Sequence, residues 1–110
     1  MKDDILYLGH INDAIETIEQ YLGNASYQEF VADKMIIDAV VRELEIIGEA
    51  ASNLSKDFCR SHPEIPFRDI IDMRNVLIHD YAGVNTTIVW ETCKNDLPPL
   101  KQAVKKGLGI

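Results

Sequence analysis

Apolar residues recur along most of this chain at intervals of three and four residues, the spacing of one face of an α-helix. The clearest case is residues 4–22, where Gly23-Asn24 follows as a stop signal. Six apolar side chains share one stripe there: Ile5, Leu8, Ile11, Ile15, Ile18 and Leu22. The same spacing continues from Ile37 to Leu54 with extra Ile, Val and Ala beside it, which predicts a long central helix.

Shorter elements are expected between and after these two helices. Ser26 is predicted to start a short helical segment that ends at Phe30 and Val31, whereas residues 55–66 are predicted to be a connection with room for one short turn. A fourth helix is predicted from about Phe67 to His79, closed by Ala82-Gly83. Its inward-facing residues are expected to be Ile70, Met73 and Leu77.

Asn85 is a suitable N-cap for a fifth helix. Pro98-Pro99 falls inside that helix, so the helix must kink or restart there. The apolar side chains that it carries are Ile88, Cys93, Leu97, Leu100 and Val104.

No segment alternates with the period of two that marks a β-strand. We therefore predict an all-α fold, an up-and-down bundle of four or five helices that forms a single domain over residues 1–110. No apolar run is long enough to cross a bilayer, and the N-terminus does not resemble a signal peptide. Cys59 and Cys93 have no disulfide-type spacing, so we expect reduced thiols in a cytoplasmic protein.

The charge of the chain argues against a general nucleic-acid-binding protein. Acidic residues number 18 against 11 Lys and Arg, which gives a net charge of −7. Neutralised phosphates supply much of the affinity for nucleic acid. Any RNA contact must therefore come from a local cluster, or from a groove that a single copy does not possess.

The candidate chemistry lies at the end of the fourth predicted helix. Arg74 sits on a stripe with Ile71 and Ile78, so its guanidinium is expected to be half-buried and to need an anionic partner. His79 lies on the neighbouring stripe, one turn beyond Asn75. From spacing alone, the favoured interpretation is structural: Arg74 pairs with Glu45 or Glu49, and His79 caps the helix.

Resemblance to a known family changes that balance. Arg74 followed by His79 after four residues and by Tyr81 two residues later resembles the motif of HEPN-domain ribonucleases, specifically the HepT toxin family. Further segments resemble the same family in the expected order and extend the likeness over most of the chain: Arg42–Ala50, Pro63–Phe67, Val89-Trp90 and Asp96–Pro98.

The resemblance implies a HEPN-like bundle and a metal-independent endoribonuclease toxin that needs no cofactor. It implies a homodimer, with higher association left open, whose two motif helices face each other across an RNA-binding cleft. Such a dimer would gather the two Arg74 side chains, with Lys34 or Arg42, into one positive groove. His79 would be the general acid or base and Arg74 the phosphate clamp, with Asn75 in support. Tyr81 would be the residue to which a cognate nucleotidyltransferase antitoxin adds AMP.

Other candidates are weaker. Cys59 and His62 have the spacing of half a zinc site without a second half, and His62 is expected to be an exposed loop residue. His10 is expected at the surface, and Asp69 with Asp72 is expected to be a solvated pair at a helix start. Two alternatives to the ribonuclease stay open: a non-catalytic, nucleotide-binding partner of a nucleotidyltransferase, and a helical dimerisation module.

Overall fold

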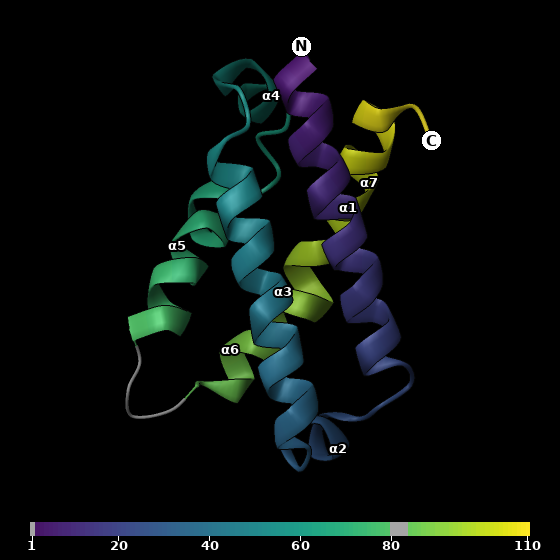
Figure 1. The fold of residues 1–110 in the computed structure, drawn as a ribbon, viewed down its shortest axis with the longest axis vertical. Coiled ribbons are helices and arrows are strands. Elements are labelled where there is room, and N and C mark those ends of the chain that lie inside the picture. The colour runs from purple at the N-terminus through teal and green to yellow at the C-terminus, as the bar shows by residue number, and fades with distance from the viewer. Residues whose placement is uncertain (1, 80–83) are drawn as a thin grey trace.

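The computed structural model consists of helices that run alternately up and down the long axis of the molecule (Figure 1). It describes residues 2–79 and 84–110, and for residues 2 and 74–79 it describes the backbone alone. All elements of the described chain are helical, as predicted: α1 (Lys2–Leu22), α2 (Tyr27–Val31), α3 (Lys34–Ser52), α4 (Lys56–Arg60), α5 (Phe67–His79), α6 (Thr86–Glu91), the π-helix η1 (Thr92–Asp96) and α7 (Leu97–Leu108). Within these segments no helix has the length and apolar character needed to span a membrane.

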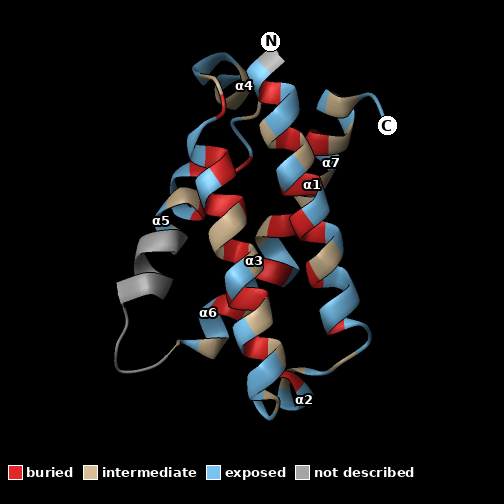
Figure 2. Ribbon diagram, in the orientation of Figure 1, coloured by how far each residue is buried: buried red, intermediate tan, exposed pale blue. Residues whose placement is uncertain are grey.

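The α3 helix is central, as its wide apolar face predicts. It packs against α1 on one side and α5 on the other, and α1 packs in turn against α7 (Figure 1). Figure 2 shows buried residues lining the sides of α1 and α3 that face other helices. The core contains the predicted stripes except for Ile5 and Ile88, and its most deeply buried residues include Leu8, Ile11, Ile15, Ile18, Val40, Ile47, Leu100 and Val104.

The helix boundaries follow the predicted local signals. Gly23 adopts a left-handed backbone with φ of 50° directly after α1, a conformation that glycine tolerates well. Ser26 and Glu29 form a reciprocal capping box at the start of α2, with bonds of 3.1 and 2.9 Å. The side chain of Asn85 accepts a 3.1 Å hydrogen bond from the Ile88 amide and caps α6, as predicted.

The start of α1 differs from the prediction. Ile5 was expected inside but is 50% exposed, whereas Asp4 is only 6% exposed. The reason is α4, which begins beside this end of α1 (Figure 1). The Asp4 carboxylate accepts hydrogen bonds from the backbone amide of Ser55 at 2.8 Å and from its hydroxyl at 2.6 Å. Burial of a carboxylate is favourable there because its oxygens are hydrogen-bonded.

The predicted interruption near Pro98-Pro99 is present, but it lies just before the prolines. The five residues of η1 widen the helix, and the Leu97 amide donates to the Thr92 carbonyl, five residues back. The prolines then occupy the first turn of α7, where their missing N–H groups cost least. The prediction for Ile88 is wrong: Ile88 is 39% exposed, and Val89 fills the core position instead.

Candidate active site

The helix that carries the motif is held in place by its first half. Pro66 precedes α5, and the buried residues Phe67 and Ile70 anchor its start against the rest of the core. The predicted bounds, Phe67 to His79, match the observed helix. Met73, expected to face inward, is partly buried against the core. The last two turns of α5 lie beyond this anchored first half, at an edge of the bundle (Figure 1).

The motif residues occupy those two turns. The backbone of α5 includes Arg74, Asn75 and His79. The side chains of these three residues and of Leu77 are not described. Tyr81 and the closing pair Ala82-Gly83 also lie outside the described residues. In an α-helix, five residues advance about 7.5 Å along the axis. Five residues also turn the helix by about 140°, so Arg74 and His79 start from different faces of α5.

The alternative partners of Arg74 lie on α3. Arg42 Nη1 lies 3.8 Å from Glu45 Oε2, a loose pair within one helix, and the Arg42 side chain is 70% exposed. The pairing of Arg74 with Glu45 or Glu49 stays a prediction, because the Arg74 side chain is not described.

A groove of about 490 Å³ lies between α1 and α3. Its lining residues are Tyr7 and His10 from α1 and Arg42, Glu45, Ile46, Glu49, Ala50 and Asn53 from α3. His10 is exposed, as predicted. The sequence did not reveal that it meets a polar face of α3 there, because the two helices are separated along the chain. The only signal was the helical spacing of Arg42, Glu45 and Glu49.

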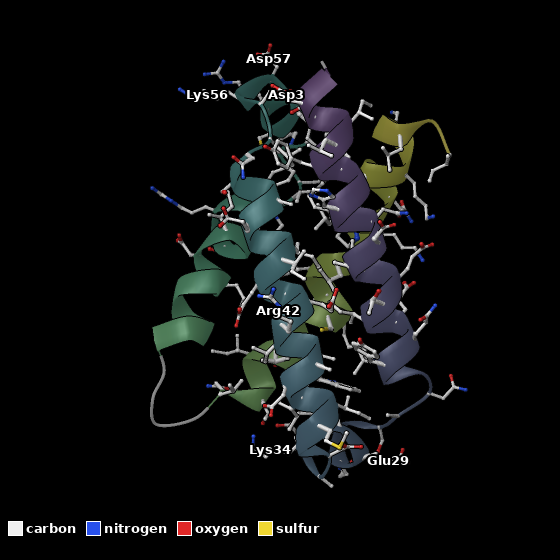
Figure 3. The ribbon with its side chains drawn as sticks, viewed as in Figure 1. Asp3, Glu29, Lys34, Arg42, Lys56 and Asp57 are labelled. Carbon is white, nitrogen blue, oxygen red and sulfur yellow. The ribbon has the colours of Figure 1, made fainter. Side chains whose placement is uncertain are left out.

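Many basic side chains of the described chain already have partners. Lys34 bonds to Asp38 at 2.8 Å, Lys101 bonds to Glu19 at 2.9 Å, and Lys105 lies 3.7 Å from Glu16. Lys94 lies over the Trp90 ring, 4.7 Å from its centre. Figure 3 shows Lys34 at the lower end of α3 and Arg42 near its middle. Lys34 and Arg42 were the two cations expected to join Arg74 in a positive groove. Lys34 is paired with Asp38, whereas Arg42 makes only the long contact with Glu45.

The segment of the half zinc site has a structural explanation. His62 lies in the loop after α4, as predicted, but the prediction that it is exposed is wrong: its side chain is 20% exposed and its ring packs on Phe58, with the ring centres 4.8 Å apart. Its Nδ1 lies 3.4 Å from Glu64 Oε1. Among the described residues, no three His, Cys, Asp or Glu side chains gather as metal ligands. The predicted pair Asp69 and Asp72 is exposed on α5.

Comparison with known proteins assigns the family. The family described as ribonuclease HepT-like matches residues 11–107, a range that includes the whole of α5. This chain belongs to the HepT-like ribonuclease family. No solved structure matches it.

Relatives of this HepT-like chain carry consistent names. A Thermococcus cleftensis protein named as a probable ribonuclease HepT is 47% identical over 100 residues, which are 91% of each chain. A candidate RNase of Caldanaerobacter subterraneus subsp. tengcongensis is 42% identical over 106 residues, 96% of this chain and 95% of the relative. A longer Methanocaldococcus jannaschii protein, named as a gamma-glutamylcyclotransferase and candidate RNase, is 41% identical over 105 residues, 96% of this chain and 47% of the relative.

Proposed function

We propose that this HepT-like chain is a toxin of the cytoplasm, an endoribonuclease that cuts RNA without a metal ion through Arg74 and His79. The observation that carries the proposal is the family match over residues 11–107, which includes both residues. The name of the Thermococcus cleftensis relative, aligned over 91% of this chain, supports the same activity.

The proposed reaction uses the 2′-hydroxyl of the RNA as the nucleophile. A base removes the hydroxyl proton, the 2′-oxygen bonds to phosphorus, and the bond from phosphorus to the 5′-oxygen breaks as that oxygen gains a proton. Imidazole can act as base or acid near neutral pH, with an effect of about 10²–10⁴-fold for such a group. A guanidinium can give two parallel hydrogen bonds to the phosphoryl oxygens and stabilise their growing charge. Asn75, one turn before His79, would orient the imidazole or the phosphate.

The proposal requires two copies of the chain, each a single domain over residues 1–110. One copy has one His79 and one Arg74, whereas two copies supply a base, an acid and a clamp. The edge position of α5, packed chiefly on α3, supports this pairing because it leaves room for the α5 helix of a second copy (Figure 1).

We further propose that a cognate nucleotidyltransferase antitoxin silences the enzyme by adding AMP to Tyr81. Tyr81 follows His79 by two residues, so the added phosphate charge and bulk would stand beside the cleft and repel RNA. Replacement of Tyr81 by Phe should leave cleavage intact and abolish neutralisation by the antitoxin. Normal neutralisation of Tyr81→Phe would refute this role.

The decisive experiment is cleavage of labelled RNA by purified protein in EDTA. Wild type should cleave, and Arg74→Ala, His79→Ala and a substrate with 2′-deoxy at the cut site should each reduce cleavage by at least about a hundredfold. Arg68→Ala, an exposed arginine on the same helix, is the matched control and should cleave normally. Loss of wild-type cleavage in EDTA, or full activity of both motif variants, would refute the mechanism.

The net charge of −7 favours a second candidate. In it, the chain is a non-catalytic partner of a nucleotidyltransferase, and Arg74 holds a nucleotide phosphate. In that function His79 positions the ligand, so it predicts no RNA cleavage under any condition, together with nucleotide binding that Arg74→Ala and His79→Ala both weaken. The cleavage assay above separates the two candidates.

A further inference from the structure

The groove between α1 and α3 has the size and lining of a ligand site. Its volume of about 490 Å³ falls within the range of small-molecule sites. Ala50 is buried and Ile46 is partly buried, and both supply an apolar surface beside the polar side chains of the groove. An apolar surface beside convergent polar groups suits a planar ring that carries hydrogen-bonding edges.

One side of the groove is aromatic. The rings of Tyr7 and His10 meet edge to face, with centres 6.0 Å apart and planes at 84°. Tyr7 is half-buried and therefore positioned by packing, whereas His10 is exposed. Aromatic faces of this kind are what proteins offer to unstacked RNA bases.

The α3 side of the groove is rich in hydrogen-bond acceptors. Glu45 and Glu49 follow one another by a single helical turn, and an ionised carboxylate only accepts. The Asn53 amide donates to the Glu49 carbonyl at 2.9 Å, so its oxygen adds another acceptor. The Glu45 carboxylate disfavours a bare phosphate and favours a ligand with adjacent N–H groups.

Guanine is the RNA base that matches this pattern. Its Watson–Crick edge presents a ring N–H next to an amino group, two donors that fit the two oxygens of one carboxylate. Adenine and cytosine offer an amino group beside an acceptor, and uracil offers one ring N–H between two acceptors. Arg42 is the cation of the groove, and its 3.8 Å distance to Glu45 leaves the guanidinium donors available for an adjoining phosphate.

We propose that this groove binds a guanine of the RNA substrate, stacked on Tyr7, with Glu45 accepting from its N–H groups and Arg42 contacting the neighbouring phosphate. The inference rests on the proposed function, because it assigns the groove and the α5 motif to one RNA strand. The arrangement supports this, since α3 carries Arg42 midway along its length and packs against α1 on one side and α5 on the other (Figures 1 and 3).

Direct binding of nucleoside monophosphates tests the groove independently of cleavage. By NMR titration of wild type, GMP should bind more tightly than AMP, CMP or UMP and shift the Tyr7 signals. Glu45→Gln should weaken GMP binding about tenfold, while Glu43→Gln on the same helix, outside the groove, should not. Equal affinity for the four nucleotides, an unchanged Kd in Glu45→Gln, or no binding because a second copy covers the groove would overturn the proposal.

A second variant keeps the proposal testable if the Glu45→Gln protein does not fold. Tyr7→Leu keeps an apolar side chain but removes the stacking face, so it should weaken all four nucleotides while the preference for GMP persists. If Tyr7→Leu left every affinity unchanged, the proposed stacking would be wrong.

Cleavage of a random-sequence RNA pool tests the link to catalysis. Sequenced products of wild type should show guanine at one fixed distance from the cut, and the cuts made by Glu45→Gln should show about tenfold less of that enrichment. Cuts without a guanine preference in wild type would overturn the inference while leaving the ribonuclease intact. If no RNA is cleaved, the proposed function fails, and the GMP titration still decides whether the groove binds guanine.

Discussion

At Asp96, burial raises the pKa of the carboxyl above its ordinary 3.8, and the nearby charge of Asp69 adds to the effect. No cap hydrogen bond offsets it, because the Leu97 amide already donates to Thr92 and the next two residues are prolines. A carboxyl whose pKa is raised on folding destabilises the folded state once it ionises. The charge at this position is therefore a cost to stability at neutral pH.

Asp96→Asn is accordingly expected to raise Tm at pH 7. The gain should shrink as pH falls through the raised pKa of the folded state and should vanish below 3.8, where the wild-type carboxyl is protonated in both states. Thermal unfolding at several pH values measures this, with the exposed Asp13→Asn as the control. A lower Tm for Asp96→Asn at pH 7 would contradict the argument.

The two thiols should differ in reactivity. Burial raises the pKa of Cys93 to about 12, and burial with the Asp4 charge also raises the pKa of Cys59, which is only partly covered. Since the thiolate is the reactive form, Cys93 should be alkylated only when the protein unfolds, whereas Cys59 should react slowly in the native state. Mass spectrometry of a labelling time course measures both rates. Equal native rates would show that Cys93 is accessible.

Among the elements, α1 is hydrogen-bonded to the start of α4 through one side chain, that of Asp4. Asp4→Ala would leave the partly buried Ser55 amide and hydroxyl without this acceptor, a cost of about 1–3 kcal/mol in the free energy of unfolding. Urea unfolding measures the loss, and Asp3→Ala, one residue away and exposed, should change stability by less than about 0.5 kcal/mol. Equal effects of the two substitutions would show that the carboxylate contributes nothing specific.

The same contact shows which features of the fold could not be predicted from the sequence. Helix starts such as Ser26 and Asn85 were predictable because a cap and its target lie three residues apart. Asp4 and Ser55 lie 51 residues apart, so periodicity alone placed Ile5 inside. Similarly, the bounds of α5 follow from local spacing, whereas the roles of Arg74 and His79 came from resemblance. The groove was not predicted, because it exists only where two distant helices meet.

For the whole molecule, the paired cations limit how strongly RNA binding can depend on salt. If a dimer contacts phosphates chiefly through two Arg74 and two Arg42, the slope of log K against log salt for single-stranded RNA should be about −3. Binding of RNA to the non-cleaving His79→Ala protein over a salt series measures it. Arg42→Gln should reduce the magnitude of this slope by about 1.4, because a dimer loses two phosphate contacts. A slope of about −6 would require more phosphate contacts than these four arginines provide.

The wide turn at η1 bears on how the family can vary in length. A π-turn holds one residue more than the α-turn that it replaces, so removal of a single residue from Thr92–Asp96 would return the chain to a regular helix. Relatives that differ by one residue between the counterparts of Trp90 and Pro98 could therefore keep the same partners on both sides. A gap placed there in an alignment would record the gain or loss of this turn during descent.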